Sequence, residues 1–418
     1  GWGKCCIVGC EAMHIDLENK VIKFKGSDKE YHEGDVLSIN GAKGLVYDVA
    51  IETMDASDNP RFQQFMEIVD KFRTMGVRTN ADTPEDAARA ISFGAEGIGL
   101  FRIEHMFYGQ NAETPLSKLR KMILAKNDEE RKAALAELEP FIKAAVKGTM
   151  KVMNGKPVTF RLLDPPLHEF VPQTEGKKEE LAEELHITVG EIEKRGESLH
   201  EVNPMMGHRG VRLHVTYPMI SETQFRAIFT AAGELKKEGF DPKPEIMVPV
   251  TISDRELRFQ KAICEKIRAE VEAEFGFEIK YMFGTMIEIP RAALTADRMA
   301  RTAEFFSFGT NDLTQMTFGF SRDDVGTFMG DYLGNKILDA DPFKTLDQKS
   351  VGKLVGYAVK EGRETRENLK CGICGEHGGD PASVEFCFKT GLNYVSCSPF
   401  RVPIARLAAA QAAIKAAK

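Results

Sequence analysis

Short apolar runs alternate with longer stretches of helical spacing from residue 77 onwards. Eight such runs have the composition of strands buried on both faces, and helix-length segments separate them. They cover residues 77–80, 97–101, 157–163, 245–250, 283–288, 305–309, 370–374 and 394–397. Between the first two runs, Thr83 and Pro84 mark a helix start, because a capping hydroxyl precedes a first-turn proline. Eight strand-helix units predict an α/β fold, a (β/α)8 barrel of the TIM type, over residues 77–418.

One connection of this predicted barrel is longer than the others. Residues 164–244 separate the third and fourth runs, and they are mostly charged with a helical pattern. A single barrel helix does not need so many residues. We therefore expect a helical insertion of about 164–244 that packs beside the barrel.

The first 56 residues follow a different pattern, with short β-type segments at 5–8, 21–24, 36–39 and 44–47. Asn40 and Gly41 form a hairpin turn before the last of these. So few residues bury only a modest core, which favours a piece of a larger β-rich domain. Residues 57–76 place apolar side chains at helical spacing and predict a linker helix. The opening Gly1, which is not a methionine, leads us to expect that the chain begins inside a longer protein.

Composition narrows the classes of partner. The 418 residues carry a formal net charge of −7, which is unlike the basic surface that nucleic-acid binding requires. No uncharged apolar run is long enough to span a membrane. Eight cysteines are few for this length and unlike a disulfide-stapled secreted protein, so we expect a reducing compartment. A cytoplasmic protein fits best, and removal of an organelle-targeting segment stays possible.

Polar side chains stand at the ends of several predicted strands, where a barrel of this type has its active site. These residues are Arg102, Arg161, Glu288, Asn311, Asp312 and Cys374. The planar fork of arginine suits carboxylate or phosphate, and Mg²⁺ commonly takes one or two protein carboxylates. The pattern therefore indicates a small anionic substrate beside a divalent metal. Structural ion pairs at the barrel rim are an equally good interpretation of the spacing alone.

Cys374 lies in a Cys-x-x-Cys sequence with Cys371. A zinc or redox site does not fit a strand, because residues three apart point to opposite faces. No second Cys-x-x-Cys completes a zinc site. The alternatives are a thiol that reaches the cavity and transfers a proton, or a buried inert thiol.

Five motifs in order resemble the phosphoenolpyruvate (PEP)-utilising enzymes. They occupy residues 97–107, 161–170, 284–291, 305–315 and 372–379, and the resemblance extends over essentially the whole chain. The string from Leu163 to Phe170 favours the pyruvate, phosphate dikinase family over PEP synthase and over enzyme I of the sugar phosphotransferase system. The resemblance implies that residues 1–56 are the C-terminal remnant of a phosphohistidine, or swivelling, domain, and that the barrel binds PEP and pyruvate.

The same resemblance implies a reaction and its residues. ATP and phosphate would phosphorylate a carrier histidine, which would exchange its phosphoryl group with pyruvate in the barrel. By motif, Cys374 would be the catalytic proton donor and acceptor, and Glu288 and Asp312 would hold Mg²⁺. The implied substrate-binding residues are Arg102, Arg161, Glu288, Gly309, Thr310, Asn311 and Asp312, with Arg209 and Arg322 as further phosphoryl contacts. A partly depressed pKa of the Cys374 thiol in a cationic pocket would help it to take the methyl proton of pyruvate, and we expect such a shift.

The resemblance also limits what this chain could do alone. The carrier-histidine motif and the ATP-binding region of the family are absent from the sequence, so we expect only a partial reaction such as pyruvate enolisation. The implied partners are the phosphohistidine domain of the full-length chain and a second copy bound through the barrel. A non-catalytic docking or dimerisation scaffold is the alternative from a different class.

Overall fold

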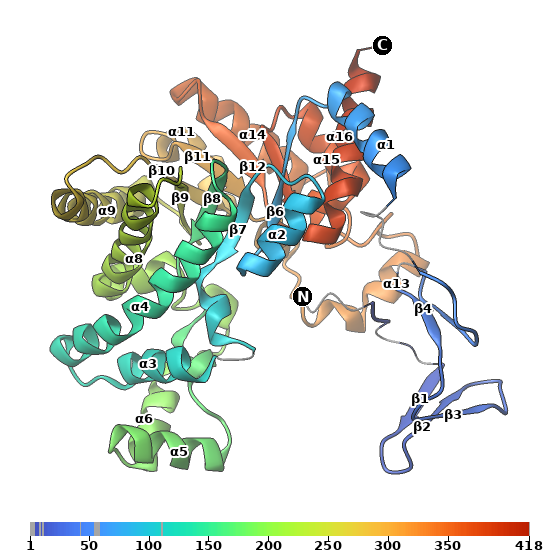
Figure 1. The fold of residues 1–418 in the computed structure, drawn as a ribbon, viewed down its shortest axis with the longest axis horizontal. Helices are drawn as coiled ribbons and strands as arrows, with labels where there is room; N and C mark the ends of the chain where they lie inside the picture. The colour runs from blue at the N-terminus through green and yellow to red at the C-terminus, as the bar shows by residue number, and fades with distance from the viewer. Residues whose placement is uncertain are drawn as a thin grey trace. The chain divides into compact units, whose positions relative to one another are not determined.

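In the computed structural model, eight parallel strands close into a barrel with helices around it (Figure 1). The structure describes residues 5–7, 10, 12–41, 43–53, 59–109 and 112–417. The barrel strands are β6 (Gly76–Asn80), β7 (Ile98–Arg102), β8 (Pro157–Arg161), β9 (Lys243–Val248), β10 (Met282–Ile287), β11 (Phe305–Phe308), β12 (Lys370–Ile373) and β13 (Tyr394–Cys397). They pair in chain order, and β13 pairs with β6 to close the ring. The predicted (β/α)8 barrel is confirmed.

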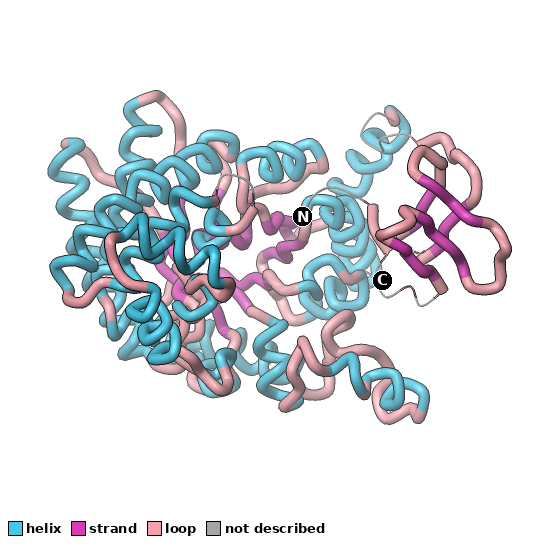
Figure 2. The backbone as a smooth tube through the Cα atoms, turned by 90° about the horizontal axis from the view of Figure 1, so that it is seen from below, coloured by secondary structure: helices cyan, strands magenta, loops and turns pink. Residues whose placement is uncertain are grey.

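Helices form the outer layer, and the strands lie inside it in both views (Figure 1, Figure 2). The layer includes α2 (Pro84–Ser92), α3 (Glu113–Leu124), α4 (Asp128–Val152), α8 (Pro218–Lys237), α9 (Asp254–Phe275), α12 (Thr310–Phe318), α14 (Val351–Thr365), α15 (Pro381–Lys389) and α16 (Val402–Ala416). The predicted start of α2 is confirmed, because the Thr83 hydroxyl accepts a hydrogen bond from the Asp86 N–H.

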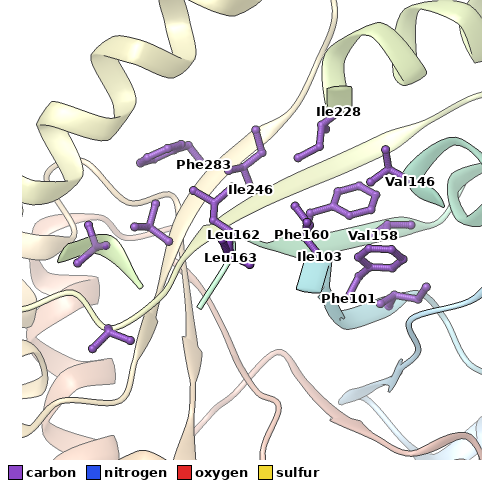
Figure 3. Close-up of a cluster of buried hydrophobic side chains, with 14 of the residues drawn as sticks. Phe101, Ile103, Val146, Val158, Phe160, Leu162, Leu163, Ile228, Ile246 and Phe283 are labelled. Atoms are coloured by element: carbon purple, nitrogen blue, oxygen red, sulfur yellow. The ribbon is translucent and has the colours of Figure 1, made fainter. Parts of the chain in front are cut away.

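Apolar side chains from neighbouring strands fill the space between the barrel and its helices (Figure 3). Phe101 of β7 and Phe160 of β8 lie edge to face, with ring centroids 5.1 Å apart. Ile246 of β9 and Phe283 of β10 continue this layer and are fully buried. Burial on both faces explains why the strands have nearly continuous apolar sequences.

The long connection between β8 and β9 differs from the expected insertion. Its first part holds the outer helices α5 (Glu175–Leu185) and α6 (Val189–Leu199) and the short α7 (Val211–Thr216). The second part is α8, which packs between α4 and α9 and buries side chains along most of its length. The prediction of one insertion up to residue 244 is therefore corrected, because α8 belongs to the helical ring of the barrel.

The N-terminal region forms a separate unit, and the contacts divide the chain between residues 62 and 63. The unit contains a three-stranded antiparallel sheet of β1 (Met13–Asp16), β2 (Val21–Phe24) and β3 (Glu30–His32). A hairpin of β4 (Ser38–Asn40) and β5 (Leu45–Tyr47) follows, as the Asn40-Gly41 turn predicted. The expected segment at 5–8 is not a strand at residues 5–7, and residue 8 lies outside the described residues.

The predicted linker helix is α1 (Pro60–Phe72), which buries Met66 and Val69. Its Asp70 binds Arg406 of α16, with Oδ1 3.1 Å from Nε. The predicted boundary at residue 56 falls among residues 54–58, which the structure does not describe. Among the described helices, none combines the length and the apolar character needed to cross a membrane.

Candidate active site

The predicted site residues stand together at the carboxyl ends of the barrel strands. Arg102 and Arg161 are the last residues of β7 and β8. Glu288 follows β10 directly, and Cys374 follows β12. The segment Gly309–Asp312 leads from β11 into α12. The barrel therefore brings to one rim the residues that the sequence separates by up to 272 positions, from Arg102 to Cys374.

Glu288 and Asp312 form a carboxylate pair at the centre of this rim. Glu288 is 1% exposed, and its carboxylate lies next to that of Asp312. Burial, followed by the charge of Asp312, raises the pKa of Glu288 well above its usual range. Two adjacent carboxylates with little water are poorly stabilised without a cation. The pair is thus suited to a divalent metal that uses few protein ligands.

The backbone next to Glu288 is strained. The N–H of Val250, just after β9, donates to Glu288 Oε1 at 2.6 Å. Val250 has φ = 58°, a left-handed conformation that a β-branched residue seldom adopts. A Cβ on Gly210 would lie 2.7 Å from the Val250 side chain, so Gly210 leaves the space for this turn. Strain of this kind is often kept at functional sites.

Each arginine of the rim is held by a buried carboxylate. Arg102 donates its backbone N–H to Asp82 Oδ1 at 2.7 Å and its Nε to Asp82 Oδ2 at 3.2 Å. Arg161 binds Glu104, and its Nη1 lies 3.2 Å from Asp164 Oδ2. These partners neutralise the guanidinium charges and fix their directions.

Arg209 connects this arginine group to the carboxylate pair. Its Nη2 lies 2.9 Å from Asp164 Oδ2 and 3.2 Å from Asp312 Oδ2. Burial opposes the charge of Arg209, but Asp164 and then Asp312 outweigh it and raise its pKa. Arg209 therefore stays charged within the site.

Arg322 lies in a different environment. Its Nη2 is 3.5 Å from Glu376 Oε1, and its backbone N–H donates to Gln315 Oε1 at 2.8 Å. About 45% of its side chain is exposed. Within the described part of the chain, no contact joins it to Glu288 or Asp312, so the structure does not bring Arg322 into the central group.

Cys374 is a buried thiol beside the arginines. Its Sγ lies 3.8 Å from the Phe308 carbonyl oxygen, and it is 3% exposed. Burial raises its pKa to about 11, although the nearby Ser307 side chain and the charges of Arg161 and Arg102 act in the opposite direction. The expectation of a depressed pKa is therefore wrong, because desolvation of the thiolate outweighs the nearby cations.

The surroundings of Cys374 are apolar on one side. Leu100, Met247, Met286 and Phe305 form a buried cluster with it. Cys371 is also a free, buried thiol, and its Sγ contacts the carbonyl oxygen of Leu369, just before β12. Among the described residues, no group of three or more His, Cys, Asp or Glu side chains could hold a metal.

The turn from β11 into α12 approaches the carboxylate pair closely. A Cβ on Gly309 would lie 2.7 Å from Glu288 Oε2 and from Met286 Sδ, so only glycine fits there. Asn311 Oδ1 and Arg161 Nε are buried and have no hydrogen-bond partner among the described residues. Buried polar atoms without partners are costly, which indicates that they are left for a ligand.

Residues 57–414 match the family model of the PEP-binding domain of PEP-utilising enzymes. The chain belongs to the PEP-utilising enzymes. It is 56% identical over 415 residues to pyruvate, phosphate dikinase of Clostridium symbiosum, which covers 99% of this chain and 47% of that protein. Pyruvate, phosphate dikinase of Giardia intestinalis is 50% identical, with 100% and 46% covered. A chloroplastic dikinase of Arabidopsis thaliana is 51% identical, with 99% and 43% covered.

The chain therefore spans less than half the length of these relatives. Several residues of the site in this PEP-utilising enzyme were missed by reasoning from the sequence. Asp82, Glu104 and Ser307 contact predicted site residues without having been assigned a role. Asp82 could have been found, because it lies just after the first predicted strand. The site residues that were predicted from the pattern lie just after their strands in the same way. Ser307 lies inside a strand, where no comparable signal exists.

Proposed function

We propose that this chain is the PEP- and pyruvate-binding part of a pyruvate, phosphate dikinase. The whole protein would convert ATP, pyruvate and phosphate into AMP, PEP and diphosphate. The observation that carries the proposal is the buried Glu288–Asp312 pair at the barrel rim, beside three arginines and the Cys374 thiol. The names of the similar proteins support the same reaction.

Mg²⁺ is the proposed cofactor, and Glu288 and Asp312 would hold it. The fit rests on the raised pKa of Glu288 and on the contact of the two carboxylates, which a divalent cation would relieve. When bound, Mg²⁺ would supply positive charge for the oxygens of a 2-oxoacid or its enol phosphate. With two protein carboxylates, the remaining ligands would be substrate oxygens and water.

The other residues would bind and position an anionic three-carbon acid. Arg102, Arg161 and Arg209 provide fixed guanidinium groups for the carboxylate and the phosphoryl group. Their carboxylate partners keep them oriented before the substrate arrives, which lowers the ordering cost of binding. Gly309, Thr310 and Asn311 would contact the substrate from the start of α12.

Cys374 would act on the substrate methyl carbon. With a pKa of about 11, the thiol holds its proton at neutral pH. When the phosphoryl group leaves PEP, Cys374 would donate this proton to the methylene carbon of the enolate and give pyruvate. In the direction of PEP formation, Cys374 would lose its proton only when substrate is bound. The reactive thiolate would therefore not form in the free protein.

The proposed partner is a phosphohistidine domain that would carry the phosphoryl group to and from the barrel. Residues 1–56 would be the C-terminal part of that domain, and residues 57–76 the linker to the barrel. A homodimer formed through the barrel, and a cytoplasmic or organellar location, remain proposals of the same kind. Arabidopsis thaliana provides a relative whose name places it in the chloroplast.

The test is exchange of the pyruvate methyl protons with solvent deuterium, followed by NMR in the presence of Mg²⁺. We expect the chain to catalyse this exchange and Cys374→Ala to slow it about 100-fold or more. Cys371→Ala is the matched control, because that thiol is buried in β12, just before Cys374, and its Sγ contacts the Leu369 carbonyl oxygen. Equal exchange by Cys374→Ala and the unmodified chain would remove the proposed role of the thiol. Absence of any saturable binding of PEP with Mg²⁺, measured by calorimetry, would favour a scaffold instead.

A further inference from the structure

His377 is a buried titratable residue that the proposed reaction does not use. It lies in the single 3-10 turn Glu376–Gly379 that follows Cys374, and it is 0% exposed. Both ring nitrogens have partners. Nδ1 lies 2.7 Å from Thr310 Oγ1, and Nε2 lies 2.8 Å from the Pro342 carbonyl oxygen.

These two partners determine the tautomer of the ring. A carbonyl oxygen only accepts hydrogen bonds, so Nε2 must carry a proton. Burial lowers the pKa of His377, which keeps the imidazole neutral and leaves Nδ1 without a proton. Nδ1 is then an acceptor, and the Thr310 hydroxyl must donate to it.

The direction of this hydrogen bond limits the role of Thr310. Its side chain is 0% exposed, and a Cβ on Gly375 would lie 2.2 Å from its Oγ1. The hydroxyl proton is therefore committed to His377 and cannot be given to a substrate. What remains of Thr310 for a ligand is its backbone, at the first position of α12.

Pro342 belongs to residues 319–350, the outer segment between α12 and α14. This segment has its own small core of Val325, Met329 and Phe343. Its other end is also joined to α12, because the Arg322 N–H donates to Gln315 Oε1 at 2.8 Å. Gln315 Nε2 in turn donates to Asp312 Oδ1 at 3.1 Å. Arg322 and Pro342 of the outer segment are thus hydrogen-bonded to Gln315 and His377. These two residues in turn contact Asp312 and Thr310 in the first turn of α12.

We propose that His377 is a positioning residue, which links the turn after Cys374 to the outer segment. In this position it fixes the first turn of α12, which carries Asn311 and Asp312. It acts through Thr310 and does not touch the substrate. The binding test of this inference rests on the proposed function. The hydrogen-bond directions rest on the two ring partners and on the neutral state of the buried ring.

The first test is a double-mutant cycle on calorimetric binding of PEP with Mg²⁺. His377→Ala and Thr310→Val should each weaken binding about 10-fold, and the double variant should be no weaker than either, because both remove the same hydrogen bond. His377→Asn should recover part of the loss, since its amide oxygen can accept the Thr310 proton. Independent, multiplicative losses in the double variant would overturn the proposal.

Ser383→Ala is the matched control. The Ser383 hydroxyl accepts a hydrogen bond from the Leu346 N–H at 3.0 Å, so this change loosens the outer segment without touching Thr310. We expect its affinity for PEP with Mg²⁺ to stay within about twofold of the unmodified chain. An equal loss in Ser383→Ala and His377→Ala would show that only general packing of the outer segment matters, and would overturn the role of Thr310.

The second test reads the ring directly. In protein labelled with ¹⁵N-histidine, His377 should show a protonated-type Nε2 signal and an unprotonated-type Nδ1 signal, assigned from the spectrum of His377→Asn. The opposite tautomer or an imidazolium would overturn the inference. This result does not depend on binding, so failure of the proposed function, seen as no binding by the unmodified chain, is distinguished from failure of the His377 assignment.

Discussion

Asp82 shows how much of the site depends on residues that would not touch the substrate. Its carboxylate accepts hydrogen bonds from both the backbone and the side chain of Arg102. The Asp82 side chain is only 4% exposed, whereas that of Arg102 is 41% exposed. The carboxylate is therefore the fixed member of the pair, and it directs the guanidinium toward the rim.

Replacement of Asp82 by Asn should weaken substrate binding more than folding. Asn keeps the size of the side chain but loses the charge and one acceptor, so Arg102 would no longer be held by two charged hydrogen bonds. We expect the Kd for PEP with Mg²⁺ to rise about 10-fold, which corresponds to roughly 1.4 kcal/mol. Calorimetry measures this change.

Asp70→Asn provides the control for Asp82→Asn. Asp70 also pairs with arginines, Arg73 and Arg406, but it lies on α1, away from the strand ends. The Asp70→Asn variant should differ from the original chain in its free energy of unfolding. Its Kd for PEP with Mg²⁺ should stay unchanged. Equal affinity of Asp82→Asn and the unmodified chain would show that Arg102 does not need this partner for binding.

From the strand pattern alone, individual site residues were predictable only where they follow a strand, whereas Arg209 was named through the motif resemblance. Arg102, Arg161 and Glu288 could be found because each ends a recognisable strand and carries chemistry of its own. Their partners could not, since Glu104 meets Arg161 across 57 positions only after β7 and β8 pair. The pKa of Cys374 was wrongly predicted for a related reason, because the extent of its burial is a property of the closed barrel.

At the scale of the elements, glycines on the inner face of the barrel leave space for large aromatic rings. A Cβ on Gly372 of β12 would lie 2.1–2.4 Å from ring atoms of Tyr394 on β13. Arg78 of β6 lies over the Tyr394 ring, with its guanidinium carbon 4.0 Å from the ring centroid. Tyr394 also lies near Ser307, which in turn lies near Cys374.

Gly372→Ala should therefore destabilise the barrel, because the ring cannot move away from the new methyl group without displacing Arg78. Overpacking of this kind costs about 1–3 kcal/mol of unfolding free energy. Urea denaturation measures it. The proton exchange of pyruvate should also slow, since Tyr394 would shift near Ser307.

Gly356→Ala is the contrasting substitution. Its Cβ would meet only the Thr390 methyl group at 4.0 Å, and it lies within α14. Alanine favours a helix interior by about 1 kcal/mol over glycine, so this variant should be as stable as the original chain or more stable. A Gly372→Ala variant of undiminished stability would show that Tyr394 adjusts freely.

The strands of the barrel were predictable and some other elements were not. All eight predicted runs coincide with strands to within two residues, because burial on both faces leaves a continuous apolar signal. The short strands β1 and β3 mix polar with apolar side chains and gave no such signal. The role of α8 was missed because charged neighbours in the same connection hid its apolar surface.

At the scale of the whole molecule, the barrel encloses charge as well as apolar side chains. Arg78, Glu245 and Lys370 come from three strands and meet in the interior, with Arg78 Nη1 2.8 Å from Glu245 Oε2. Glu245 is 3% exposed. Such a group stabilises the fold only while all its members are charged and paired, so its contribution depends on closure of the complete ring.

His214 provides a further buried group whose charge state links the whole fold to pH. It lies on α7 and is 0% exposed, and the Gln224 amide nitrogen is 3.4 Å from its Nε2. Burial lowers its pKa to about 4, although Asp164 acts in the opposite direction. In the unfolded chain the same imidazole has a pKa of about 6.5. Between these values the unfolded state binds a proton that the folded state does not.

The protein should therefore lose stability as the pH falls from about 6.5 toward 4, and His214 should account for about 2–3 kcal/mol of that loss at pH 4.5. In His214→Gln this part of the pH dependence disappears, so the difference in unfolding free energy between pH 7 and pH 4.5 should shrink by the same amount. Urea denaturation at the two pH values gives this difference, and titrating carboxylates common to both proteins cancel. His200→Gln, at an exposed histidine, should leave the difference unchanged. If the difference in unfolding free energy between the two pH values is the same in His214→Gln as in the original chain, the folded state binds the proton as readily as the unfolded chain. Local opening of α7 or hydration of the imidazole would then allow this binding.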